Sequence, residues 1–367
     1  RPGSPEIRPA NFWGGLAREI VSPLAGEVIP QSWLWSCMTC LSCADRCPVG
    51  VQHVPLIVQM RRFLVAEGEV DSRLQQALEN LTRYGNSFGQ SDRAPSRWTQ
   101  GQGLRIKDAR REPVEYLWFV GDYASYDARA QAVTRAAARV FHLAGLDFGI
   151  LYEGERNAGN DLRRAGEEGL FETLMQKNLQ TLERARFRTI VTTDPHTYHA
   201  LKNEYPGLFA NGHDGVRQVL HYTELLDHLI HTRRLPVLRR VPGAVTYHDP
   251  CYLGRYNGVY MPPRRLLESL GARLVEMPRN RADSYCCGAG GGRIWMEDTP
   301  EVTERPAESR VREAARLGVS ALVVACPKDL VMFGDALKTT GLEGKLAVKD
   351  LVELVEEAVM PPEAMTK

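Results

Sequence analysis

Residues 285–293 read Tyr285-Cys286-Cys287-Gly288-Ala289-Gly290-Gly291-Gly292-Arg293, two adjacent cysteines followed by a run of small residues. Adjacent cysteines are poorly placed to chelate one zinc ion or to form an unstrained disulfide with each other. They can bind different irons of one cluster, and glycines let backbone N–H groups approach an anionic, sulfide-rich body. Cys251 lies upstream of the pair and Cys326 lies downstream of it. We therefore expect four thiolates from three loops to converge on one iron–sulfur site.

A second group of cysteines reads Cys37-Met38-Thr39-Cys40-Leu41-Ser42-Cys43-Ala44-Asp45-Arg46-Cys47-Pro48. This is C-x2-C-x2-C-x3-C-P, the spacing of a bacterial ferredoxin half-site. It predicts a [4Fe–4S] cluster on Cys37, Cys40, Cys43 and Cys47, with a helix over 54–67 behind it. In two-cluster ferredoxins the fourth cysteine ligates the other cluster. Either Cys47 folds back onto its own cluster, or a second run precedes Arg1.

Composition supports ligand thiolates in a soluble protein. All eight cysteines of the 367-residue chain lie in these two groups. A chain of this length does not need disulfides and shows no secretion signal, so a reducing, cytoplasmic compartment is expected. The apolar and charged fractions of 43% and 25% are those of a globular protein, and the net charge of +1 gives no reason to expect nucleic acid. No apolar run approaches the roughly 18 residues that span a bilayer.

The order of predicted elements divides the chain into four parts. Residues 1–83, with helices expected over 13–20, 54–67 and 70–83, form a ferredoxin-like domain that is incomplete at its N-terminus. The polar stretch 84–114 is predicted to be a linker. In 115–240 and again in 241–367, short apolar strands alternate with helices, which predicts α/β units with parallel strands. Strand ends that carry ligands are where open α/β sheets bind cofactors.

The two α/β units match in spacing. Asp122 to Asn157 encloses 34 residues, as Cys251 to Cys286 does. Each cysteine of the second unit has a non-cysteine counterpart in the first, namely Asp122, Asn157, Ala158 and Asp194. Duplication followed by loss of the thiolates explains this pattern, and the first unit is expected to act as a structural partner. Carboxylates rarely hold soft metals alone, so structural carboxylates are favoured over an oxygen-ligated metal at Asp122 and Asp194.

These residues resemble the CCG domain of heterodisulfide reductase catalytic subunits and of iron–sulfur proteins that couple electron-transfer flavoproteins to quinone. The phrases that carry the resemblance are Trp35-Ser36-Cys37-Met38-Thr39-Cys40, Met60-Arg61-Arg62, Lys202-Asn203-Glu204-Tyr205-Pro206, Tyr247-His248-Asp249-Pro250-Cys251-Tyr252-Leu253-Gly254-Arg255-Tyr256-Asn257-Gly258 and Cys286-Cys287-Gly288 with its glycines. The resemblance implies two Rossmann-like CCG repeats behind a small α-helical ferredoxin-like domain. It also implies a second [4Fe–4S] cluster, of the non-cubane kind that five cysteines hold in the family. Here Asp329 stands at the fifth position, either as an oxygen ligand or with a four-thiolate cluster beside it.

The function implied is that of an electron-transfer subunit. It would take electrons from a flavoprotein, hydrogenase or dehydrogenase subunit and pass them through both clusters to quinone or another acceptor. A membrane cytochrome b or quinone-binding subunit is a further implied partner, with attachment to the inner face of the membrane through it or through a missing N-terminal segment. Arg1-Pro2-Gly3-Ser4-Pro5 resembles the family phrase that follows a first cysteine run, so such a run is expected upstream. The alternatives are a disulfide reductase and a non-redox zinc or scaffold protein.

His248 and Asp249 directly precede Cys251 and are candidate catalytic residues that would deliver protons at the cluster. The competing expectation is that His248 hydrogen-bonds a loop carbonyl. Arg255 and Arg293 are expected either to offset cluster charge or to lie on a solvated face. Three further histidines, His196, His199 and His221, show no ligand spacing.

Overall fold

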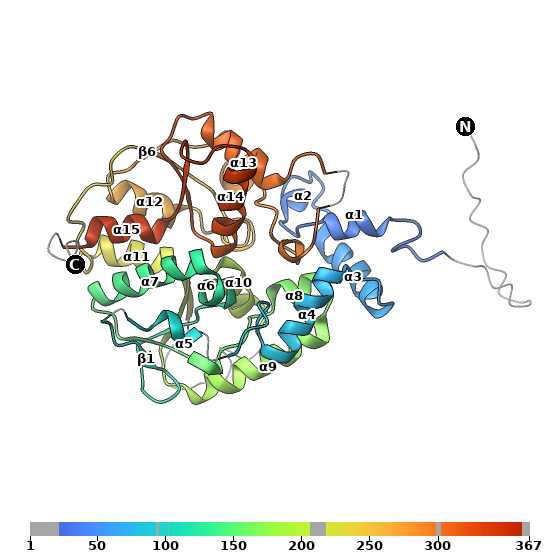
Figure 1. Ribbon diagram of the computed structural model, residues 1–367, viewed down its shortest axis with the longest axis horizontal. Helices are drawn as coiled ribbons and strands as arrows, with labels where there is room; N and C mark the ends of the chain where they lie inside the picture. The colour runs from blue at the N-terminus through green and yellow to red at the C-terminus, as the bar shows by residue number, and fades with distance from the viewer. Residues whose placement is uncertain (1–21, 93–94, 102, 206–217, 299–301, 362–367) are drawn as a thin grey trace, which may run out of the picture.

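Two sheets of parallel strands form the main body of the molecule (Figure 1). The computed structural model describes residues 22–92, 95–101, 103–205, 218–298 and 302–361. The first sheet has the order β1-β3-β2-β4-β5 and consists of β1 (Lys107–Asp108), β2 (Tyr116–Trp118), β3 (Phe148–Ile150), β4 (Thr189–Thr192) and β5 (Gln218–His221). The second has the order β7-β6-β8-β9 and consists of β6 (Ala244–Tyr247), β7 (Arg273–Leu274), β8 (Ala321–Val324) and β9 (Ala347–Asp350). Apart from the edge strand β1, the two orders are equivalent: β3-β2-β4-β5 corresponds to β7-β6-β8-β9. The predicted duplicated α/β unit with parallel strands is confirmed.

Helices cover both faces of each sheet, which is why the central strands β4, β6 and β8 are buried along their whole length. The helices of the first unit are α6 (Asp122–Tyr126), α7 (Ala128–Leu143), α8 (Asn160–Ala165), α9 (Glu168–Arg184), α10 (Pro195–Asn203) and α11 (Tyr222–His231). Those of the second are α12 (Met261–Ser269), α13 (Pro306–Ala315), α14 (Pro327–Thr339) and α15 (Leu351–Val359). Short 3₁₀ turns, η1 (Tyr152–Gly154), η2 (Arg281–Asp283) and η3 (Arg293–Trp295), lie in the loops that follow β3 and β7.

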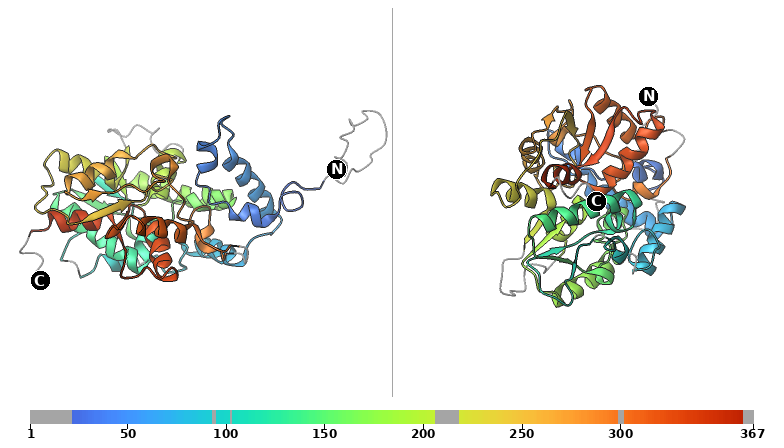
Figure 2. Two further views of the ribbon diagram at one scale, coloured as in Figure 1. Left: turned by 90° about the horizontal axis from the view of Figure 1, so that it is seen from above. Right: turned by 60° about the vertical axis from the view of Figure 1, so that its left-hand side comes forward.

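The N-terminal part is helical and lies at one end of the molecule, beside both units (Figures 1 and 2). It contains α1 (Gln31–Ser36), α2 (Ser42–Asp45), α3 (His53–Ala66) and α4 (Ser72–Tyr84). The helices expected over 54–67 and 70–83 are present as α3 and α4, whereas the one expected over 13–20 lies outside the described residues. None of the described helices is long and apolar enough to cross a membrane.

The stretch 84–114, predicted as a linker, packs against the first unit. It contributes the edge strand β1, which pairs with β3, and the short helix α5 (Pro95–Trp98). The Trp98 ring is fully buried against Trp118, with ring centroids 5.4 Å apart. The sequence of this stretch is mostly polar, so it does not predict that the stretch packs against the first unit.

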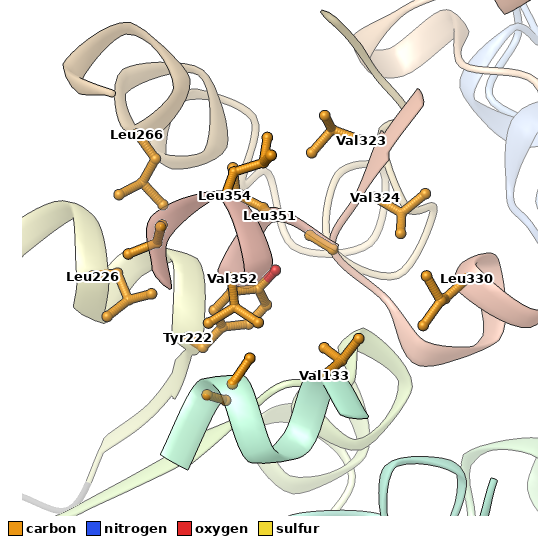
Figure 3. Packing of buried hydrophobic residues seen from close by; sticks show 14 of the residues in the cluster. Val133, Tyr222, Leu226, Leu266, Val323, Val324, Leu330, Leu351, Val352 and Leu354 are labelled. Atoms are coloured by element: carbon orange, nitrogen blue, oxygen red, sulfur yellow. The ribbon is translucent and has the colours of Figure 1, made fainter. Parts of the chain in front are cut away.

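The two units exchange their last helices. Helix α11, which ends the first unit, packs on α12, while α15, which ends the second, packs on α7. Figure 3 shows the result: Leu351, Val352 and Leu354 of α15 lie among Leu226 of α11, Leu266 of α12 and Val133 of α7. One apolar core therefore spans both units. At its centre the buried Tyr222 hydroxyl donates a hydrogen bond to Asp350 Oδ1 (2.6 Å), which joins the first residue of α11 to the N-cap of α15.

Tyr222→Phe tests this joint. The substitution keeps the ring but leaves the buried Asp350 carboxyl without that donor, so the free energy of unfolding should fall by about 1–3 kcal/mol. Urea unfolding of the whole chain measures the change. Tyr84→Phe, at a ring that is 42% exposed, is the matched control and should lie within about 0.5 kcal/mol of the parent. Equal stability of both variants would contradict the role assigned to Tyr222.

Candidate iron–sulfur site

The double-cysteine loop lies at the carboxyl edge of the second sheet. Cys251 follows β6, Cys326 follows β8, and Cys286 and Cys287 come from the loop after β7. Because parallel strands end at one edge, these three loops meet there. Cys287 and Cys326 are buried, and the Gly288 N–H points at Cys286 Sγ (3.3 Å). Burial raises the pKa of Cys251 to about 12, so this thiol stays protonated at neutral pH until a metal displaces the proton.

Asp329 lies beside this thiol group. Its carboxyl is 2% exposed, interacts with the Cys287 thiol, and has a pKa that burial raises to about 7. Oδ2 of Asp329 is buried and has no hydrogen-bond partner among the described residues; His248 Nε2 lies 3.6 Å away. A buried carboxylate oxygen without a hydrogen-bond partner, close to the thiols of Cys251, Cys287 and Cys326, fits an additional oxygen ligand to a cluster.

Cys326 is turned toward the first unit. Its sulfur and ligand atoms of Asp194 and His196 all lie within 4.8 Å of one another. Both Asp194 oxygens are already used at the N-terminus of α10, where they accept hydrogen bonds from the His196 and Thr197 N–H groups. Cys326 is therefore the thiol at which the second unit's site borders the first unit.

The first cysteine loop winds tightly, since Thr39 and Leu41 both adopt positive φ (49° and 66°). The Thr39 N–H points at Cys37 Sγ (3.4 Å). Cys37 lies within electrostatic reach of Cys40 and Cys43, and burial raises its pKa. At Cys47 the backbone N–H groups of Val51, Val49 and Gly50 lower the pKa of the partly exposed thiol, as expected of a sulfur that binds iron as thiolate. The neighbouring thiols of Cys37, Cys40 and Cys43, and the N–H groups directed at the sulfurs of Cys37 and Cys47, suit an iron–sulfur cluster.

The two cysteine loops are in direct contact. The Cys40 thiol interacts with that of Cys286, and a Cβ on Gly290 would lie 2.4 Å from the Met38 carbonyl oxygen. Arg255 Nε donates to the Cys40 carbonyl (2.7 Å). The structure thus places Arg255 at the junction of the two groups of thiols, and not on a solvated face.

A buried guanidinium fastens this contact. Arg61 of α3, 0% exposed, donates from Nη1 to the carbonyl oxygens of Arg164 (3.0 Å) and Gly291 (3.0 Å). Its other nitrogens donate to the carbonyls of Leu34 and Cys37. One side chain thus joins the N-terminal helices, the first cysteine loop and both α/β units.

The two candidate catalytic residues have different surroundings. His248 is buried; its Nδ1 accepts a hydrogen bond from Arg310 Nε (3.2 Å), so the partner is a guanidinium and not a loop carbonyl. Burial, Arg310 and Arg255 lower the pKa of His248 well below its usual value. Asp249 accepts two hydrogen bonds from Arg264 (2.7 and 3.0 Å) and one from the Arg281 N–H (2.7 Å). These contacts hold the Asp249 side chain against Arg264 and Arg281, and His248 Nε2 lies 3.6 Å from Asp329 Oδ2. Proton delivery by either residue stays a prediction.

At the corresponding edge of the first unit, the side chains that replace the cysteines are hydrogen-bonded to one another and to neighbouring groups. Asp122 Oδ2 accepts from the Ser87 N–H and hydroxyl (3.2 and 2.8 Å) and from Asn157 Nδ2 (2.8 Å). Phe88 packs edge-on against Tyr123, with ring centroids 5.0 Å apart. These contacts fit the structural carboxylate expected at Asp122.

Two charged residues at the site were missed by sequence reasoning. Lys328 lies between Cys326 and Asp329, is 3% exposed, and forms an ion pair across the two units with buried Asp161. Its position inside the Cys-Pro-Lys-Asp segment was a signal, but Asp161 is 167 residues away. Arg293, which was expected either to offset cluster charge or to lie on a solvated face, pairs with Asp298 (2.7 Å) beside the glycine loop, residues 288–292.

This fold and this donor set define the class: a duplicated α/β protein that carries iron–sulfur ligands. A profile of the cysteine-rich domain CCG matches residues 116–202 and 245–334. The chain is 39% identical over 345 residues to a probable iron-sulfur-binding oxidoreductase, FadF, of Bacillus subtilis, and the match covers 92% of this chain and 48% of that protein. It is 33% identical over 357 residues to EtfAB:quinone oxidoreductase of Syntrophomonas wolfei (94% and 49%).

A third relative is matched over most of its own length. The chain is 30% identical over 331 residues to a component of the dihydromethanophenazine:CoB–CoM heterodisulfide reductase of Methanosarcina barkeri, and the match covers 88% of this chain and 77% of that component. The chain therefore belongs to the CCG-domain family of iron–sulfur oxidoreductase subunits, and the resemblance seen in the sequence is confirmed. It spans about half the length of the first two relatives.

Gly290→Ala tests the contact between the cysteine loops. The new methyl group meets the Met38 carbonyl, so the loops must move apart, at a cost of about 1–3 kcal/mol in the free energy of unfolding. Gly334→Ala is the control, because a Cβ there meets nothing within 4 Å and α14 should gain up to about 1 kcal/mol. Chemical unfolding of both variants decides the point. A Gly290 variant as stable as the parent would show that the loops are not in contact.

Proposed function

We propose that this chain is an electron-transfer subunit that carries two iron–sulfur clusters. One cluster is held by Cys37, Cys40, Cys43 and Cys47 of a ferredoxin-like domain. The other is held by Cys251, Cys286, Cys287 and Cys326, with Asp329 as an additional oxygen ligand. When bound, such clusters supply one-electron redox chemistry, and the protein sets geometry and potential.

The observation that carries this proposal is the contact between the two groups of thiols. Cys40 interacts with Cys286, and Arg61 and Arg255 bind carbonyls on both sides of the contact. Two metal sites with only structural roles would not need to be in contact. Electron transfer from one cluster to the other requires that the two clusters lie close together. Arg255 and Arg61 also offset the negative charge that a ligated cluster brings into a buried site.

The names of the relatives support a choice of redox partners for this chain. One is called an EtfAB:quinone oxidoreductase, which supports an electron-transfer flavoprotein as donor and quinone as acceptor. We propose a redox complex of this kind, with a flavoprotein, hydrogenase or dehydrogenase subunit on one side and a membrane cytochrome b or quinone-binding subunit on the other. The chain would then work in the cytoplasm at the inner face of the membrane.

Disulfide reduction is the second candidate, because one relative is part of a heterodisulfide reductase. The first unit argues against it. Where the second unit has Cys251 and Cys286, the first has Asp122 and Asn157, hydrogen-bonded to each other and, through Asp122, to Ser87. A reductase that uses two CCG clusters would need thiolates there.

Iron and acid-labile sulfide, measured on protein purified without oxygen, test the proposal. We expect about eight of each per chain, as two four-iron clusters require. Cys37→Ser and Cys286→Ser should each remove about four irons and leave the other cluster intact. Cys47→Ser tests whether Cys47 is a ligand of the first cluster. If it is, this variant should also lose about four irons. Zinc in place of iron, in a colourless protein, would rule the relay out.

Asp329→Ala tests the oxygen ligand. The variant should keep its iron but change the electron paramagnetic resonance spectrum of one cluster, because a ligand has been lost. The matched control is Asp335→Ala on the same helix, whose side chain is 53% exposed and should leave the spectrum unaltered. A spectrum identical to the parent's in the Asp329 variant would exclude this carboxylate as a ligand.

A further inference from the structure

Thr39, which lies between the first two cysteines of the first cysteine loop, has an unusual backbone conformation. The residue is fully buried and its φ is 49°, in the left-handed region that β-branched residues rarely adopt. In this conformation its N–H points at Cys37 Sγ (3.4 Å). Strained residues of this kind persist only where their surroundings hold them, and they gather at functional sites. The contacts that hold Thr39 therefore decide how this loop presents an N–H group to its sulfur.

Two hydroxyl groups of the second α/β unit hold Thr39. The Tyr252 hydroxyl and Thr39 Oγ1 share a hydrogen bond (3.0 Å). The Tyr256 hydroxyl donates to the Thr39 carbonyl oxygen (2.7 Å). A Cβ on Gly291 would lie 3.1 Å from Thr39 Cγ2, so the glycine loop packs closely on the threonine methyl group. The side chain and the carbonyl of Thr39 are thus both fixed by residues more than 200 positions away.

The two tyrosine rings are themselves held in place. Both lie in the loop that follows Cys251, and they stack with ring centroids 4.4 Å apart and planes 8° apart. Helix α10 of the first unit packs two histidines on this pair. The His196 ring centroid lies 4.4 Å from that of Tyr252, and the His199 ring centroid lies 4.9 Å from that of Tyr256. These two histidines, which show no ligand spacing in the sequence, therefore support the rings whose hydroxyls reach the first cysteine loop.

We propose that Tyr252 and Tyr256 are positioning residues that hold the first cysteine loop in the shape that binds its cluster. By fixing Thr39 in the left-handed conformation, they keep its N–H directed at Cys37 Sγ. An N–H group directed at a ligand sulfur favours the reduced, more negative state of a cluster, so it raises the reduction potential. The inference rests on the proposed function, because it gives residues of the second unit a role in tuning the first cluster.

Alkylation of the metal-free full chain with iodoacetamide, resolved by residue with mass spectrometry, tests the positioning of the loop. Tyr256→Phe keeps the stacked ring but removes the donor to the Thr39 carbonyl, so the loop should open more often. The loss of one buried hydrogen bond corresponds to about a fivefold rise in the labelling rate of Cys37 and Cys40.

Two controls accompany this measurement. Tyr84→Phe makes the same chemical change at a ring that is 42% exposed, and it should label at the parent's rate. Cys326 lies in another loop of the same chain, and its labelling rate should not change in Tyr256→Phe. Equal acceleration at Cys326 would overturn the inference, because a general loosening of the molecule would then explain the result.

The reduction potential of the first cluster is the second readout, since a purely structural role of the tyrosines would not move it. It is followed by electron paramagnetic resonance during a redox titration in the Cys286→Ser background, which should hold this cluster alone. Tyr256→Phe should lower the potential while the iron content stays constant. Tyr84→Phe should leave both unchanged.

Iron counts on the same samples separate this inference from the proposed function. A labelling rate or a potential that Tyr256→Phe leaves unchanged, in protein that holds its iron, would overturn the inference and leave the relay untouched. Faster labelling of Cys37 and Cys40 in a chain that holds no iron when purified would support the positioning of the loop while the relay fails.

Discussion

The structure depends on one buried guanidinium. Arg61 donates to carbonyl oxygens of α1, of the first cysteine loop, of α8 in the first unit and of the glycine loop in the second. Burial lowers the pKa of Arg61 to about 10, which still leaves it charged at neutral pH. A buried charge is tolerated only where hydrogen bonds replace its water, and here backbone carbonyls do so. The four segments that Arg61 joins are therefore held in one arrangement.

The two units differ at the carboxyl edges of their sheets. Both have the same strand order and exchange their last helices, so either sheet edge could hold ligands. In the first unit, Ser87 and Asn157 bind the Asp122 carboxylate, and the edge is closed by hydrogen bonds. In the second, the first cysteine loop packs on the double-cysteine loop, and the Cys40 thiol contacts the Cys286 thiol. The first unit, which has no cysteines, still takes part in the second unit's site. Its Asp161 forms an ion pair with Lys328, and its Asp194 lies beside Cys326.

Much of the architecture could be predicted because it is encoded locally. Short apolar strands that end in Cys251 or Cys326 give a parallel sheet with ligands at one edge, and the spacing of the repeat gives its duplicate. The junction of the two cysteine loops could not be predicted in this way. Arg61 and Gly291 are 230 residues apart, and although Arg61 stands in one of the phrases that carry the family resemblance, that phrase does not show which distant carbonyls its side chain binds. Asp249 is a different case: its position beside Cys251 suggests chemistry, the structure adds that Arg264 binds its carboxylate, and its catalytic role stays a prediction. The polar stretch 84–114 likewise hides the buried Trp98.

The two cysteine sites are expected to act as one electron-transfer unit, because Arg61 and Gly290 hold their loops together. Electron paramagnetic resonance during a stepwise reductive titration tests it most directly. If the clusters lie as close as Cys40 and Cys286 do, reduction of the second must broaden and split the signal of the first through spin–spin interaction. A fully reduced spectrum that is the simple sum of two independent cluster signals would contradict the account.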